Sequence, residues 1–350
     1  MIKRLIVIAA LLACIFFVDP QPAYAGYETE RKDGKHFTLV NEAGQIIDQT
    51  ALSVFTGDEF IAPDNRRYKV VKVKDTKCYC KFVGIEKTAS LETKGANLAA
   101  FGLTPVMANS KGEVAIYHTH SDESYVPTDG TESKTGKGGI YQVGDALTNK
   151  LRNLGVKVVH DTTAHDPHDP NAYYRSRRTA SRLMRQGALA IIDVHRDAVP
   201  PNVYATKVSG ENVTKVKLVV GRQNSNMSAN LAFAKRIKAY LDKNEPGLAA
   251  GIFMGKGSYN QDLTPRALLV EVGAHTNSKI QAERGVSLFA KAIPSVLGIT
   301  TTNNNPTAKP LNVVSKTGSQ KSDWSSILWV IVGLGVIYGA YILINRGRVK

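Results

Sequence analysis

The sequence predicts an α/β fold: a mostly parallel sheet flanked by helices, with a small N-terminal β-rich module and a C-terminal transmembrane helix. Three observations support this prediction. Between residues 112 and 298, short apolar runs alternate with longer helical segments, as in βαβ units. Residues 26–105 alternate short strands with turn signals. A long uncharged run near the C-terminus has the length that a membrane helix needs.

The N-terminus has the features of a secretory signal. Lys3 and Arg4 precede an apolar run over residues 5–18, and Ala23-Tyr24-Ala25 matches a small-residue cleavage site. The run has 14 residues, fewer than the roughly 18 that indicate a transmembrane helix. We therefore predict that residues 1–25 are a cleaved signal peptide, and an uncleaved anchor is the alternative.

The next region, residues 26–105, predicts two hairpins. The first joins residues 35–40 to 45–48, and the second joins 67–73 to 78–83. Cys78 and Cys80 are two residues apart and so lie on the same side of a strand. Two thiols alone do not make a zinc site, so we interpret them as small strand residues.

The central region, residues 112–298, predicts an α/β domain. The run at 188–194 is continuously apolar, which is typical of a strand buried on both faces. Glycines at 155 and 187 end two of the helices. The expected strands are 114–117, 156–159, 188–194, 216–220 and 267–272, and the expected helices are 143–154, 172–186, 226–244 and 280–297.

The C-terminal part predicts a tether. Residues 299–323 are rich in Thr, Asn, Lys and Ser and indicate a flexible linker. Residues 324–345 contain the uncharged run, and the basic tail 346–350 follows. Positive charge after an apolar span favours a cytoplasmic C-terminus. We therefore expect a single-pass protein of the cell membrane with its catalytic domain outside the cytoplasm.

The net charge is +15, from 45 Lys and Arg against 30 Asp and Glu. Such a charge indicates an anionic partner, which can be nucleic acid, a membrane surface or cell wall. The predicted outward topology and the lack of interleaved basic and aromatic residues argue against nucleic acid. The cell wall and the membrane surface are therefore the expected partners.

Ionisable side chains gather at the ends of three predicted strands, where ligands bind in open α/β sheets. Two histidines and a carboxylate can form a catalytic zinc site with one open position, and a further carboxylate can serve as general base. Each group also has a structural interpretation, since a strand-end histidine can be structural and Glu271 can pair with Arg196 or Arg266. The candidates are His118, His120 and Glu123 after the first strand, His195 and Arg196 in the second, and Glu271 in the third.

Three further histidines, His160, His165 and His168, also have ligand chemistry. The last two lie in a segment rich in Asp and Pro, residues 164–170. This composition favours a solvated loop over a metal site.

Several segments resemble stage II sporulation protein P over roughly residues 112–298. They include His118-Thr119-His120 with Glu123-Ser124-Tyr125, Asp193-Val194-His195-Arg196-Asp197-Ala198 and Val270-Glu271-Val272-Gly273. That family is similar to zinc-dependent N-acetylmuramoyl-L-alanine amidases. The resemblance implies an amidase fold, Zn²⁺ and cleavage of peptidoglycan between N-acetylmuramic acid and L-alanine. It further implies endopeptidase activity on cross-links, a role in engulfment during sporulation, and a lytic transglycosylase and a membrane scaffold protein as partners.

The resemblance also implies residue roles. His120 and His195 correspond to the zinc histidines, and Glu271 to the catalytic glutamate. Glu123 is the preferred third ligand, with Glu132 as the alternative. His118 would orient His120 or join the metal shell, and Arg196 would hold a substrate carboxylate or the developing oxyanion.

The layout departs from the family, whose members carry an N-terminal membrane anchor. A wall-opening component of a conjugation or secretion system is therefore an alternative to a sporulation role. A non-catalytic wall-binding module is a second alternative, but both histidines and Glu271 are retained. The sequence therefore favours an enzyme.

Overall fold

The computed structural model describes residues 28–31, 33–87 and 113–299. The chain divides into two compact units, Met1–Pro306 and Thr307–Lys350, and the second lies outside the described residues. The predicted signal 1–25, linker residues 300–323, the predicted transmembrane segment 324–345 and the tail 346–350 also lie outside them.

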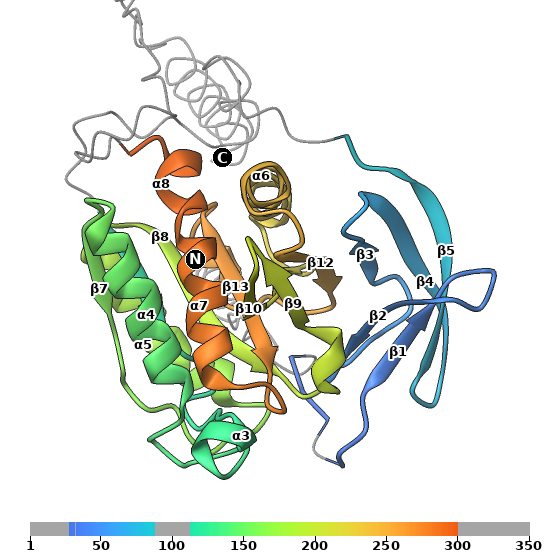
Figure 1. The fold of residues 1–350 in the computed structure, drawn as a ribbon, viewed down its shortest axis with the longest axis horizontal. Coiled ribbons are helices and arrows are strands. Elements are labelled where there is room, and N and C mark those ends of the chain that lie inside the picture. Colours follow the sequence, from blue (N-terminus) through green and yellow to red (C-terminus); the bar gives the residue numbers. More distant parts are fainter. Residues whose placement is uncertain (1–27, 32, 88–112, 300–350) are drawn as a thin grey trace, which may run out of the picture. The chain divides into compact units, whose positions relative to one another are not determined.

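Eleven strands form one sheet in the order β2-β1-β5-β4-β3-β12-β11-β13-β8-β6-β7, and β9 and β10 form a separate hairpin (Figure 1). The bounds are β1 Phe37–Val40, β2 Ile46–Thr50, β3 Glu59–Ile61, β4 Arg66–Lys74, β5 Lys77–Ile85, β6 Glu113–Tyr117, β7 Val158–His160, β8 Ala188–Asp197, β9 Ala205–Val208, β10 Glu211–Thr214, β11 Val216–Gly221, β12 Ala249–Gly255 and β13 Ala267–Ala274.

The sheet is mixed, which corrects the predicted mostly parallel sheet with a separate β module. Strands β6, β7, β8 and β13 are parallel neighbours, as expected, but β11 runs antiparallel to β13. Strand β3 pairs antiparallel with β12, so the N-terminal strands extend the same sheet. The sequence did not indicate β12, since its Ala- and Gly-rich start weakens the strand pattern.

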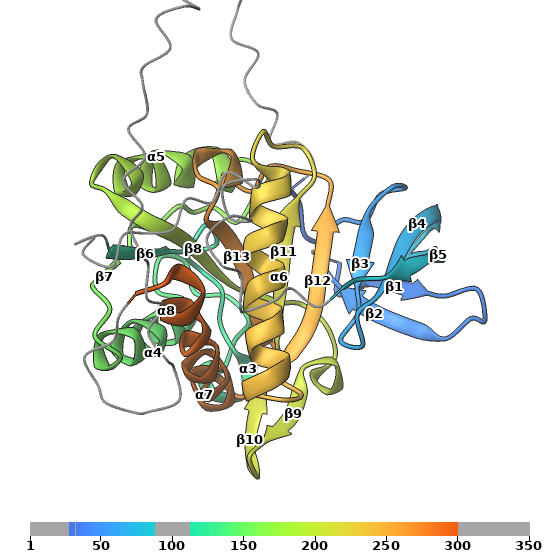
Figure 2. The same cartoon turned by 90° about the horizontal axis from the view of Figure 1, so that it is seen from above.

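Helices cover both faces of the central strands, as the view from above shows (Figure 2). Apolar residues alternate along β6, with Val114 and Ile116 packed in one core and Ala115 and Tyr117 in another. The first core includes α4, α6, α7 and α8, and the second includes α5. The bounds are α3 Val126–Asp129, α4 Ile140–Asn153, α5 Ala172–Arg185, α6 Met227–Asn244, α7 Lys279–Ala290 and α8 Ala292–Leu297, with short 3-10 turns Pro201–Val203 and Gln261–Leu263.

The single helix expected over 280–297 is two helices, α7 and α8. Pro294 lies near the start of α8. A proline lacks the N–H that would continue the ladder, and its ring clashes with the carbonyl four residues earlier, here that of Ala290. The chain therefore ends α7 at Ala290 and begins a new helix.

The N-terminal strands share a core with the face of the sheet on which α5 lies. Phe60 and Leu52 pack with Val219, Phe253 and Leu269 in that core. Because side chains alternate along a strand, Glu271 lies on the same face as Leu269, and His195 on the same face as Ile191. The N-terminal region therefore covers the face that carries the predicted site residues.

No helix within the three described ranges is both long and apolar enough to cross a membrane. This finding corrects two predictions, the fold with a C-terminal transmembrane helix and the single-pass membrane localisation.

Candidate metal centre

Four buried side chains converge with metal-binding atoms within 4.8 Å of one another: Glu30, His120, Glu123 and His195. Three of them are predicted ligands, and they come from two elements. His120 and Glu123 follow β6, and His195 lies near the end of β8. The parallel pairing of β6 and β8 brings these two strand ends together. Glu30 comes from the N-terminal segment, through an isolated antiparallel bridge with Leu52.

The separations fit an ion held between the side chains. Glu123 Oε1 lies 3.2 Å from His120 Nδ1 and 3.3 Å from His195 Nδ1, and Glu30 Oε1 lies 3.6 Å from His120 Nδ1. Tetrahedral ligands at the usual Zn–N and Zn–O distances are about 3.4 Å apart. Glu30 Oε1 is buried without a hydrogen-bond partner. Nitrogen and oxygen donors at these separations fit a divalent metal cofactor.

Asp193 supports His195 from behind. Its Oδ1 lies 3.0 Å from His195 Nε2, the ring nitrogen that faces away from Glu123. Thr119 fixes the same carboxylate, donating to it from its backbone N at 2.8 Å and from Oγ1 at 2.5 Å. A carboxylate on the second nitrogen of a ligating histidine is a common way to fix that ring.

Glu271 is the unpaired carboxylate of the site. It lies in β13 directly opposite His195 in β8, is fully buried, and neither of its oxygens has a hydrogen-bond partner. Arg196, one of the two arginines considered as its partner, contacts Glu30 and Glu123 instead. Burial, and then the nearby Asp197, raise the pKa of Glu271 well above its usual value. A buried carboxyl without a hydrogen-bond partner is costly, which makes Glu271 a candidate functional group.

Arg196 borders the donor group. Its backbone N donates to Glu123 Oε2 at 2.9 Å, and its Nη2 donates to the backbone oxygen of Glu132 at 3.2 Å. Its Nη1 lies 3.6 Å from Glu30 Oε2, and both Nη1 and Nε lack a hydrogen-bond partner. The guanidinium therefore has donors available for an anionic group.

The histidines and Glu123 have opposite pKa shifts. Burial alone would raise the pKa of Glu123, but the nearby His195, Arg196 and His120 hold it well below its usual value. Burial would lower the pKa of His195, but Asp193 and Glu123 raise it well above. These shifts favour an ionised Glu123 beside a protonated His195, and a metal bound here would take the place of the His195 proton.

His118 does not join the donor group. It donates from Nδ1 to the backbone oxygen of Val194 at 2.9 Å, and its Nε2 lies 2.8 Å from His160 Nε2. His160 in turn contacts Asp145 at 3.0 Å. A Cβ at Gly144 of α4 would lie 2.6 Å from His118 Nε2, so the glycine makes room for the pair. Burial, and then His160, lower the pKa of His118 to about 3.

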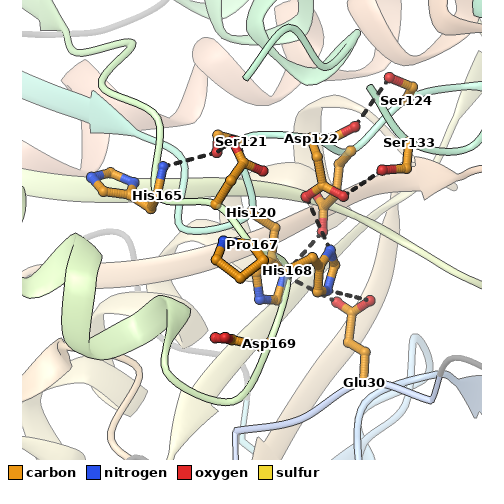
Figure 3. A network of polar contacts seen from close by, with 12 residues as sticks. Glu30, His120, Ser121, Asp122, Ser124, Ser133, His165, Pro167, His168 and Asp169 are labelled. Atoms are coloured by element: carbon orange, nitrogen blue, oxygen red, sulfur yellow. Dashed lines mark hydrogen bonds and ion pairs between the residues drawn. The ribbon is translucent and has the colours of Figure 1, made fainter. Parts of the chain in front are cut away.

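His168, expected in a solvated loop, lies against the donor group. Its ring stacks on that of His120 at 3.6 Å between centroids, and its Nδ1 donates to Asp122 Oδ1 at 3.1 Å. Its Nε2 lies 3.7 Å from Glu30 Oε2 (Figure 3). His165 from the same loop is buried and structural, with its Nδ1 donating to the backbone oxygen of His118 at 2.7 Å.

Besides His118 and His168, Glu132 and Glu30 also differ from the expected site. The side chain of Glu132, the alternative ligand, is 67% exposed and lies 3.8 Å from His275, outside the donor group. Glu30 was not anticipated, because it stands in no motif and lies 90 residues before His120 in the chain. Only the fold of the N-terminal strands over the sheet brings it to the site.

Comparisons with known proteins give one family. The model for stage II sporulation protein P matches residues 59–294. Stage II sporulation protein P of Bacillus subtilis (strain 168) is 32% identical over an alignment of 200 residues, which covers 51% of this chain and 50% of that protein. This chain thus matches about half the length of that relative.

Two solved structures have low similarity. The CwlD amidase from Clostridioides difficile, in complex with the GerS lipoprotein, is 13% identical with a TM-score of 0.34, over 53% of this chain and 98% of that one. An N-acetylmuramoyl-L-alanine amidase from Clostridium difficile 630 is 14% identical with a TM-score of 0.33, over 54% of this chain and 96% of that one. The match over residues 59–294 spans well over half of the chain, and the protein belongs to the stage II sporulation protein P family.

Proposed function

We propose that the protein is a zinc-dependent peptidoglycan hydrolase that cleaves the amide bond between N-acetylmuramic acid and L-alanine. The observation that carries the proposal is the unpaired, buried carboxylate of Glu271 opposite His195 in the donor group. Metal-assisted hydrolysis of an amide requires at least a group of metal ligands and a neighbouring general base. Membership of the family supports wall remodelling during sporulation as the setting.

His120, Glu123 and His195 would hold the metal. When bound, Zn²⁺ would supply an activated water and polarise the scissile carbonyl. Asp193 would keep the His195 ring oriented through Nε2. The three ligands leave one position for water, which is the pattern of catalytic rather than structural zinc sites.

Glu271 would move the proton. Its carboxylate would accept a proton from the attacking water and return it to the leaving amine, as a general base and then a general acid. Its raised pKa lets it hold that proton between the two steps. Arg196, whose Nη1 and Nε have no hydrogen-bond partner, would bind the negative charge that develops on the carbonyl oxygen.

The test is hydrolysis of purified peptidoglycan by the metal-loaded protein. We expect Glu271→Gln to lower the rate by about 10²–10⁴-fold, the usual contribution of a general base, while the protein keeps its metal. Glu211→Gln is the matched control, because Glu211 is exposed in β10 and outside the donor group. Glu271→Gln activity equal to wild type would refute the assignment of Glu271. Wall binding without hydrolysis by any form would indicate a binding module.

A further inference from the structure

Glu30 gives the candidate metal centre a fourth protein ligand. Structural zinc sites are closed by four protein ligands, whereas catalytic sites use three and leave one position open. With Glu30 in place, the donor group has the four members of a closed site. In this arrangement no position would be left for water or substrate.

The Glu30 carboxylate is surrounded by side chains that can bind an anion. Its Oε2 lies 3.6 Å from Arg196 Nη1. The same oxygen lies 3.7 Å from His168 Nε2, and Glu30 Oε1 lies 3.6 Å from His120 Nδ1 (Figure 3). Arg196 Nη1, His168 Nε2 and Glu30 Oε1 have no hydrogen-bond partner. Buried unpaired polar atoms are rare in folded proteins and indicate a ligand or an exchangeable contact.

Resting on the proposed function, we propose that residues 28–31 form an autoinhibitory strap that holds Glu30 on the metal. Glu30 then stands in for an anionic group of the substrate, and the site opens when the strap withdraws. The inference deepens the proposed function, since it says how the hydrolase is restrained.

The backbone pairing of the strap is confined to one short edge, opposite residues 51–53. Arg31 N donates to Ala51 O at 3.0 Å, and Ser53 N donates to Thr29 O at 2.8 Å. The hydroxyl oxygens of Thr29 and Ser53 are 2.7 Å apart. A pairing this short is easily opened, because local unfolding is cheapest where few buried contacts must break.

Glu28 fastens the other end of the strap. Its carboxylate accepts hydrogen bonds from the backbone N of Tyr259 at 2.7 Å and of Ser258 at 2.5 Å. A Cβ at Gly257 would lie 2.6 Å from Glu28 Cγ, so this glycine admits the close approach. Residues 257–259 therefore hold the strap through Glu28, independently of the contacts that Glu30 makes.

The test combines metal retention with wall hydrolysis in the full chain. Glu30→Gln removes a charged ligand, and we expect chelator competition to show zinc held roughly 10- to 100-fold less tightly, a range known for weakened metal sites. The same variant should cleave purified peptidoglycan about tenfold faster or more, because a minor open state of roughly 0.1–10% would become the main one. Glu211→Gln should change neither readout.

A reversible disulfide that holds the strap in place tests whether the strap itself blocks the site, apart from any change in the metal ligands. Thr29 and Ser53 are directly opposite in the antiparallel pairing, so Thr29→Cys with Ser53→Cys can form a cross-strand disulfide. The oxidised form should stay inactive at full metal content, and reduction should restore activity. Each single variant cannot form the disulfide and should have the same rate before and after oxidation.

Three outcomes would overturn the inference: unchanged zinc retention in Glu30→Gln, a slower rate in that variant, or full activity of the oxidised double variant. If wild type, Glu30→Gln and the reduced double variant all fail to cleave, the proposed function fails. Zinc retention in Glu30→Gln then still decides whether Glu30 is a ligand.

Discussion

Replacing Lys217 by Met should strongly destabilise the protein. Lys217 lies in β11 with no exposed side-chain surface, and its Nζ is 2.8 Å from Asp48 Oδ1 and 3.4 Å from Asp197 Oδ2. It also donates to the backbone oxygen of Gln49 at 2.8 Å. Asp197 in turn accepts from Ala51 N at 2.8 Å. Lys217 and Asp197 therefore connect residues 48–51 to the central strands β11 and β8.

The magnitude follows from the burial of all three charges. Removing one partner of a buried ion pair leaves an uncompensated charge and costs about 3–5 kcal/mol. For a domain of this size that corresponds to a fall in Tm of roughly 6–20 °C. Adding Asp48→Asn should restore more than half of the loss, because Asp197 keeps a hydrogen bond from Tyr204 at 2.9 Å and from backbone N–H groups.

The effect should depend on pH. Burial raises the pKa of Asp48 to about 6, despite the opposing effect of Lys217. A raised carboxyl pKa contributes stability below the unfolded value near 4, and this is lost as pH rises through about 6. Lys217→Met should therefore cost less at pH 5, where Asp48 takes up a proton, than at pH 7.5. Urea unfolding followed by circular dichroism measures both, and a loss below about 1 kcal/mol at pH 7.5 would refute the reasoning.

Three further predictions concern the site and the thiols. Asp193→Asn should lower zinc affinity roughly 10- to 100-fold in chelator competition, and unchanged affinity would show that Asp193 does not support His195. The acid limb of the rate profile should lie above pH 4.5, because burial raises the pKa of Glu271 and the base must be ionised; a limb at or below 4.5 would argue against this base. Cys78 and Cys80 should resist dithionitrobenzoate at pH 8 until urea unfolds the protein, because burial raises both thiol pKa values to about 12. Rapid labelling of the native protein would contradict their burial.

Strands β6, β7, β8, β11 and β13 could be predicted because each is a short apolar run between glycine- or turn-rich segments. Strand β8, for example, was expected over 188–194 and spans Ala188–Asp197. The pattern ends at Val194 because His195, Arg196 and Asp197 are polar, although each is buried by contacts within the site. A search for apolar runs cannot recognise the end of a buried strand when its last residues are polar.

The site could be predicted only in part, for a related reason. His120, Glu123 and His195 follow strand ends that pair in the sheet, so local sequence carries the signal. Glu30 and His168 reach the site through tertiary packing, from the N-terminal segment and a loop after β7. Likewise, β3 and β12 pair although they lie far apart in the chain. No local sequence pattern specifies that pairing.

The most direct test of the proposed chemistry is mass spectrometry of fragments released from purified peptidoglycan. Wild type and Glu30→Gln would be assayed after chelation and again after addition of Zn²⁺. We predict stem peptides with a free L-alanine amino terminus, absent after chelation, restored by Zn²⁺ and released faster by Glu30→Gln. Intact wall in the presence of folded, zinc-loaded Glu30→Gln would contradict a zinc-dependent amidase.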